Sequence, residues 1–218
     1  MTRPPLPIDH ESGRLFFGLV LFCGIALVLS VPGARVVREL GSTQQIVRTL
    51  GLDMTWVFLD AYVLAMGLLG LSLGSADAER REQASRRIGR LALRVLLGQL
   101  FCLPYLVFSC AVFPGREGGL ALVVLLATVT ALVCAVQNGR IERAGDSSTR
   151  SLSGYAILLA VSLVPLVRMP LLSPIGAARL LVDGASPLQA LAAFFAPTAL
   201  LAALCVVAAR LRGEAHAV

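Results

Sequence analysis

The chain has 218 residues, of which 57% are hydrophobic and 15% charged, and its mean hydropathy is +0.82. Soluble domains are about 45–50% apolar and about 25% charged, so this composition excludes an ordinary soluble domain and indicates a chain whose solvent is lipid. The five cysteines are scattered and the net charge is +6, which excludes a disulfide framework and, in a membrane protein, indicates arginine-rich loops rather than nucleic-acid binding.

Six stretches are long and apolar enough, or nearly so, to cross a bilayer as helices. A bilayer core about 30 Å thick requires about 20 mostly apolar residues in a helix. No stretch alternates with a period of two, which favours helices over a β-barrel. The sequence therefore predicts an all-α, polytopic membrane protein, with one transmembrane domain over residues 15–210 between tails 1–14 and 211–218. The predicted spans are Leu15–Val31, Met54–Leu73, Leu91–Phe113, Gly118–Val136, Leu152–Leu172 and Leu188–Ala209.

The placement of the arginines predicts the orientation of these spans. If the N-terminus is cytoplasmic, thirteen of the 19 arginines lie in cytoplasmic segments and six lie outside, which follows the positive-inside rule. Both termini are then cytoplasmic. Trp56 lies at the outer headgroup level, where its amphipathic ring is favoured.

The segment after the second span, residues 75–90, is the most polar part of the chain. Ser75 is a good helix N-cap, and the acidic residues that follow suit the positive end of a helix dipole. We interpret the segment as a cytoplasmic helix that either docks a partner protein or only enforces the topology and attracts anionic lipid. The charged residues available for docking are Asp77, Glu79, Arg80, Arg81, Glu82, Arg86, Arg87 and Arg90.

Several polar residues lie at membrane depth, where charge is costly and indicates a functional role. Asp60 lies six residues past Met54, about 9 Å along a helix, and Arg168 lies near the outer end of the fifth span. We expect these two to pair between spans two and five, or alternatively to reach the outer interface separately. In the third span, Gln99 should hydrogen-bond a neighbouring helix, and Arg94 should extend to the cytoplasmic headgroups.

The segment between the fifth and sixth spans has clear helix start and stop signals. Ser173 and Pro174 supply a cap and a first-turn proline, and Gly184 supplies the stop. They predict a short external helix, Pro174–Val182, which contains Arg179 and is followed by Asp183. Ser186 to Gln189 then repeats the start signal as a capping box for the last span.

Motifs for catalysis and metal binding are missing from the sequence. All 19 basic residues are arginines, whereas a P-loop requires a lysine for the phosphates. Both histidines lie in the tails, and there is no HExxH, CxxC or paired-carboxylate motif. We therefore expect no enzyme activity, catalytic residue, metal or cofactor in this chain, and we interpret the cysteines as small apolar residues.

Taken together, this layout resembles the membrane (permease) subunit of type-2 ABC exporters. In the comparison, residues 76–90 stand at the position of the coupling helix and Pro174–Val182 at that of the external helix. The ending from Ser173 to Gly184, followed by a span and Arg210-Leu211-Arg212, is similar to the close of many such permeases. The size also resembles the small permease of haem-export type.

The resemblance implies a multi-pass protein of the bacterial cytoplasmic membrane. It implies two permease chains, as a homodimer or with a second permease, together with separate cytoplasmic ATPase chains whose closure pushes on residues 76–90. Two other classes remain open. One is the substrate-capture subunit of a vitamin transporter, and the other is a non-catalytic membrane subunit that assembles or anchors a larger complex.

Overall fold

The fold was examined in a computed structural model, which describes residues 14, 16–25, 56–78, 84–112, 115–144, 150–166 and 168–215. All regular structure within these ranges is helical. A helical segment, Phe16–Ile25, comes first. The labelled helices are α3 (Val57–Ala78), α4 (Ala84–Val112), α5 (Glu117–Ala144), α6 (Arg150–Leu163), the 3-10 turn η1 (Pro170–Leu172), α7 (Pro174–Val182) and α8 (Pro187–Ala215).

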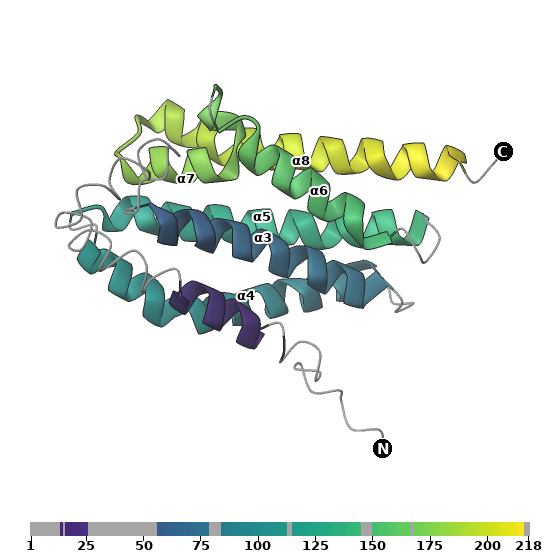
Figure 1. The fold of residues 1–218 in the computed structure, drawn as a ribbon, viewed down its shortest axis with the longest axis horizontal. Helices are drawn as coiled ribbons and strands as arrows, with labels where there is room; N and C mark the ends of the chain where they lie inside the picture. Colours follow the sequence, from purple (N-terminus) through teal and green to yellow (C-terminus); the bar gives the residue numbers. More distant parts are fainter. Residues whose placement is uncertain are drawn as a thin grey trace, which may run out of the picture.

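The long helices form an elongated bundle in which the chain direction alternates (Figure 1). Helices α3, α5 and α8 start at the end that carries α7, whereas α4 and α6 run toward it. We call this end the α7 end. The other is called the arginine end, because Arg86, Arg87 and Arg140 lie there on α4 and α5.

Three helices of the described chain are long and apolar enough to cross a membrane. They contain the segments Phe58–Ala76, Glu117–Ile141 and Pro187–Leu211, which coincide with the predicted second, fourth and sixth spans. Two shorter apolar helices, Phe16–Ile25 and Ser153–Leu163, lie within the predicted first and fifth spans. By length and composition, these helices indicate a membrane protein.

The predicted fifth span is wrong as a single helix over residues 152–172. Helix α6 ends at Leu163, and the chain then turns, with the Met169 N–H donating to the Pro165 carbonyl at 2.7 Å. The physical reason is that Pro165 has no N–H to donate and its ring disfavours continuation of the helix. Pro104 and Pro197, in contrast, remain inside α4 and α8.

The core of the bundle is a close crossing of α3 and α5. A Cβ added at Gly70 would lie 2.1 Å from the carbonyl oxygen of Ala131, and one added at Gly74 would lie 2.4 Å from that of Ala135. The α5 alanines at these contacts are fully buried. Small residues four apart on both helices let the two backbones approach, and this motif was absent from the sequence prediction.

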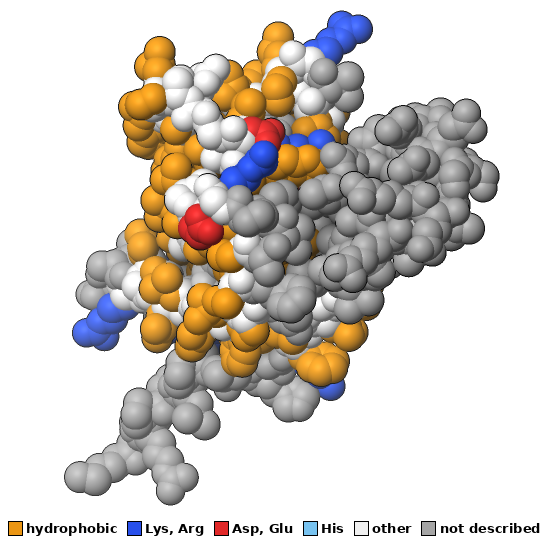
Figure 2. Space-filling model, turned by 90° about the vertical axis from the view of Figure 1, so that its left-hand side faces the viewer, with side chains coloured by type: hydrophobic (Ala, Val, Ile, Leu, Met, Phe, Trp, Pro, Cys, Tyr) orange, Lys and Arg blue, Asp and Glu red, His pale blue; other side chains and the backbone are white. Residues whose placement is uncertain are grey.

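The outer surface of the bundle is rich in large apolar side chains. Phe17, Val107 and Leu188 are 70%, 64% and 78% exposed. Figure 2 looks onto the α7 end, where a few acidic and arginine side chains lie among apolar ones. An outer surface with so many exposed apolar side chains suits contact with lipid rather than with water.

Candidate functional site

Helix α7 has the bounds that the sequence predicted, Pro174–Val182. Ser173 caps it, since its hydroxyl oxygen accepts a hydrogen bond from the Gly176 N–H at 3.3 Å. At the other end Gly184 has a φ of +90°, a conformation that glycine adopts without steric cost. The Ser173 hydroxyl also donates to the Ser162 carbonyl at 2.6 Å, which ties the start of α7 to the end of α6.

The start of α8 carries the predicted capping box. The Ser186 N–H donates to the Gln189 side-chain oxygen at 3.1 Å, and the Gln189 N–H donates to the Ser186 hydroxyl at 3.4 Å. This reciprocal pair satisfies two N–H groups that a helix start leaves without intrahelical partners. The direction change between α7 and α8 is therefore encoded by local residues.

Helix α7 is packed into the bundle end rather than lying free on its surface. It contacts α3, α5 and α8, and Ile175, Ala177 and Leu181 are buried. A Cβ added at Gly119 would lie 2.5 Å from the Leu181 carbonyl oxygen, so the backbones of α5 and α7 are in close contact. A shift of α7 therefore requires a rearrangement of the helices around it.

An ion pair joins α7 to α3. The Arg179 guanidinium donates two hydrogen bonds to the Asp60 carboxylate, from Nε to Oδ1 at 2.9 Å and from Nη2 to Oδ2. The two side chains are 25% and 19% exposed. A bidentate pair with this little exposure is stronger and more directional than a surface pair.

The expected partner of Asp60 is corrected by this geometry. Arg168, which the sequence suggested, is exposed in the turn between α6 and η1, because α6 ends at Leu163 and no helix carries Arg168 toward α3. Arg179 is placed on a helix that packs directly against α3. Its predicted depth in the membrane identified Asp60 as a carboxylate that requires a cationic partner. That partner is Arg179 of α7 and not Arg168.

A second ion pair at the α7 end is more exposed. Arg116 Nη1 lies 2.7 Å from Asp183 Oδ1, and these side chains are 43% and 54% exposed. Exposed pairs contribute roughly 0–1 kcal/mol to stability. Arg116–Asp183 thus closes the C-terminal end of α7 onto the start of α5 with less energy than Asp60–Arg179.

A chain of hydrogen bonds crosses the interior. Tyr62 on α3 donates to the Gln99 side-chain oxygen on α4. Gln99 Nε2 donates to Thr128 Oγ1 on α5 at 2.8 Å, and Thr128 donates to the Val124 carbonyl at 2.7 Å. The prediction that Gln99 bonds a neighbouring helix is confirmed, and Gln99 joins three helices.

Gln99 also lines a groove of about 410 Å³ between α4 and α5. Its other described walls are mainly leucine and valine side chains of these two helices, together with Glu117. The groove is therefore mainly apolar, and at Gln99 it borders the buried hydrogen-bond chain.

The described parts of the proposed docking segment belong to two different helices. Ser75 and Asp77 lie in the last turns of α3, and α4 starts at Ala84. The expected helix start at Ser75 is wrong, because Ser75 lies inside α3. Its hydroxyl accepts a hydrogen bond from Asn138 Nδ2 at 2.8 Å. Glu79, Arg80, Arg81 and Glu82 lie outside the described residues.

The arginines at the start of α4 differ in exposure. Arg86 is exposed, whereas Arg87 and Arg94 are 7% and 2% exposed. A Cβ added at Gly139 would lie 2.0 Å from Arg87 Nη2, which places Arg87 against α5. Arg87 therefore cannot be a surface docking residue, and Arg94 lies inside the bundle instead of extending to the headgroups. Helix periodicity did not predict that Arg87 and Arg94 are buried, because it does not show which face of α4 packs against α5.

Asn138 is a polar residue that the sequence reading missed. Its Nδ2 donates to the Leu71 carbonyl at 2.9 Å as well as to Ser75. With Arg87 against Gly139, it forms a polar junction of α3, α4 and α5 at the arginine end. The predicted fourth span ended at Val136, two residues before Asn138, whereas α5 continues to Ala144.

Within the described residues, no three His, Cys, Asp or Glu side chains group as metal ligands do. The main polar features of this part of the chain are instead the Asp60–Arg179 ion pair, the Gln99 hydrogen-bond chain and the polar junction at the arginine end. Comparison with known proteins finds no family model, curated relative or solved structure that matches the chain.

Proposed function

We propose that the chain is the permease subunit of a type-2 ABC exporter, driven by a separate ATPase chain. The observation that carries this proposal is helix α7, a short capped helix directly before the last long helix, clamped to α3 by Asp60–Arg179. A short external helix in this position is one of the features through which the sequence resembles such permeases. In the proposal, α7 lies on the external side.

The distribution of charge supports that orientation. The arginine end carries more arginines than the α7 end, and arginines are enriched in cytoplasmic segments. The two termini would then be cytoplasmic. Among the described helices and turns, the arginines of the α7 end are Arg116, Arg168 and Arg179, whereas the arginine end carries Arg86, Arg87, Arg90, Arg94, Arg140, Arg143, Arg150, Arg210 and Arg212.

The proposal also requires α4 to cross the membrane with Arg94 inside it. Helix α4 has 29 residues, which is about 43 Å at 1.5 Å per residue and exceeds the bilayer core. Arg94 is 2% exposed, so neighbouring helices rather than lipid surround it. Charged residues of membrane helices generally face the bundle interior in this way, where polar groups of neighbouring helices can meet the charge.

The ATPase would dock on arginines at, and just before, the start of α4. Arg86 is exposed on the surface of the arginine end, and Arg80 and Arg81 precede it in the sequence. Arg87 is excluded from this surface because it packs against α5. The docking contact is therefore proposed for Arg80, Arg81 and Arg86.

The test is to purify the full chain from its native membrane in mild detergent and to identify co-purifying proteins by mass spectrometry. We expect a stoichiometric P-loop ATPase and measurable ATP hydrolysis. Replacing Arg80, Arg81 and Arg86 with glutamine should reduce the affinity for the ATPase, and with it the bound ATPase, about tenfold or more. Each lost charge contact costs about 0.5–1 kcal/mol, so the three together cost at least about 1.4 kcal/mol.

The matched control replaces Arg140 and Arg210 with glutamine. Both are exposed arginines of the same end, but they lie on α5 and α8, so the ATPase should remain bound. Equal loss in both variants would mean that total charge, and not this surface, holds the partner. A partner without nucleotide-binding motifs would replace the exporter proposal with the assembly-subunit alternative.

A further inference from the structure

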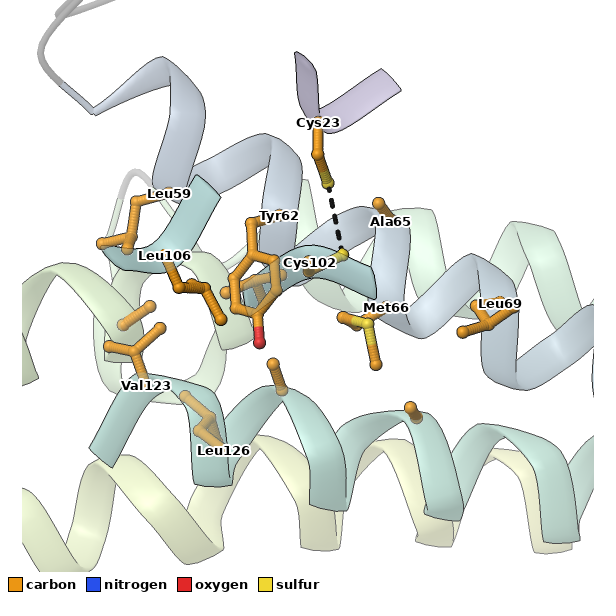
Figure 3. Close-up of a cluster of buried hydrophobic side chains, with 14 of the residues drawn as sticks. Cys23, Leu59, Tyr62, Ala65, Met66, Leu69, Cys102, Leu106, Val123 and Leu126 are labelled. Carbon is orange, nitrogen blue, oxygen red and sulfur yellow. Dashed lines mark hydrogen bonds between the residues drawn. The ribbon is translucent and has the colours of Figure 1, made fainter. Parts of the chain in front are cut away.

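Two cysteines on different helices face each other inside the bundle. Cys23 Sγ, on the helical segment Phe16–Ile25, lies 3.9 Å from Cys102 Sγ on α4 (Figure 3). Both residues are 0% exposed. The sequence suggested only dispersed, small apolar cysteines, because the two are 79 positions apart and nothing local links them.

The packing of the two helices sets this contact. A Cβ added at Gly98 would lie 3.7 Å from Leu19 Cδ2, so Leu19 lies against Gly98, one helical turn before Cys23 meets Cys102. Phe16 and Phe101 pack with ring centroids 5.4 Å apart. Cys23 follows Leu19 by four residues, and Cys102 follows Gly98 by four, so the Leu19–Gly98 contact holds the two sulfur atoms in register.

The surroundings of the two sulfurs are apolar. Ala65, Met66 and Leu69 of α3 lie in the same buried cluster, and Figure 3 shows them below and beside the sulfur pair. A bound metal ion would place charge in this environment, which is costly. A disulfide is neutral, like the two thiols it replaces, and its formation leaves no charge to be solvated.

We propose that Cys23 and Cys102 form a disulfide with a lipid-soluble quinone as oxidant. Two S–H bonds break and one S–S bond forms, and the two electrons and two protons pass to the quinone, which becomes the hydroquinone. A lipid-soluble oxidant is chosen because the sulfurs lie in an apolar interior into which a quinone partitions and a water-soluble oxidant does not. Because both cysteines are fully buried, the reaction requires the helical segment Phe16–Ile25 to open locally from α4. The bond would fasten the helical segment Phe16–Ile25 to α4. This proposal is independent of the transport function.

The test treats the full chain, in membranes and under reducing-agent-free conditions, with a fully ring-substituted benzoquinone that carries an alkyl chain. Such a quinone has no free ring position to which a thiol can add. After denaturation and alkylation, two of the five thiols should resist modification. Peptide mapping of the wild-type protein should give one linked peptide that joins Cys23 to Cys102.

Cys110→Ser is the matched control, since Cys110 is on the same helix and its Sγ donates to the Leu106 carbonyl at 3.6 Å. This variant should still lose two thiols, whereas Cys102→Ser should lose none. Oxidised glutathione should give less of the linked peptide than the quinone does. The wild-type chain alone decides the proposal. It would be overturned if all five thiols are alkylated after quinone treatment, or if the linked peptide joins any other pair of cysteines.

Discussion

The Asp60–Arg179 pair is the strongest polar contact between α7 and the long helices. Its geometry is bidentate, and its atoms are partly shielded from solvent. If either partner is lost, the remaining charge stays in a half-buried position without its counter-ion. Removing one partner of such a pair therefore costs more than the net worth of the pair itself.

We predict that Asp60→Asn and Arg179→Gln each lower the apparent melting temperature in detergent and that their effects are not additive. In a double-mutant cycle the coupling should be about 1–3 kcal/mol, as for residues in direct contact. The measurement is thermal unfolding of the two single variants and the double variant.

Two other cycles serve as controls for this prediction. Arg116→Gln with Asp183→Asn should couple by roughly 0–1 kcal/mol, because that pair is more exposed. Asp60→Asn with Arg168→Gln should be additive, since Arg168 is exposed in a turn. Additive effects of the Asp60 and Arg179 variants would contradict a stabilising ion pair between these two residues.

At the scale of helices, the crossing of α3 and α5 depends on residues without side-chain bulk. Gly70 and Gly74 on α3 lie against the backbone of Ala131 and Ala135 on α5. A backbone carbonyl cannot rotate away as a flexible side chain can. Any added Cβ therefore separates the two helices and disturbs the residues that they bury together.

We predict that Gly70→Ala destabilises the protein by about 1–3 kcal/mol, as overpacking of a close-packed interior does. Gly89→Ala is the matched control: Gly89 is also helical, and an added Cβ there meets nothing within 4 Å. That variant should be neutral or stabilised by roughly 0.5–1 kcal/mol, because alanine has the higher helix propensity. The measurement is thermal unfolding in detergent, and equal stability of the two variants would refute the close-crossing argument.

The same scale explains which helices the sequence predicted well. Helices α7 and α8 start where predicted because a cap, a first-turn proline and a capping box act over four residues. The fifth span was predicted too long, because a window of hydropathy averages over Pro165. Residues 84–90 were assigned to a separate cytoplasmic helix because their arginines lower hydropathy, whereas in the structure they are the first turns of α4.

At the scale of the whole molecule, the bundle has a chemically asymmetric pair of ends. The α7 end has two ion pairs around one short helix, whereas the arginine end has a buried junction of Arg87 with α5. If the chain spans the bilayer, this asymmetry determines which end faces the cytoplasm.

We predict that Arg116→Cys reacts with a membrane-impermeant maleimide added outside intact cells, whereas Arg140→Cys reacts only after the membrane is opened. Both side chains are exposed, at opposite ends of α5. Four of the native cysteines are buried and the fifth is half-buried, so the wild-type chain gives the background signal. The reverse labelling pattern would invert the proposed topology.

The sequence by itself determined the properties that depend on short stretches of chain. Apolar length indicated membrane helices, and capping residues located α7 and the start of α8, since these effects act within a few residues of where they are encoded. Only the tertiary structure decided which helices meet. It placed Arg179 rather than Arg168 on Asp60, buried Arg87 and Arg94, and brought Cys23 to Cys102. Such contacts depend on the rotation and register of helices far apart in sequence, and these follow from packing over the whole bundle.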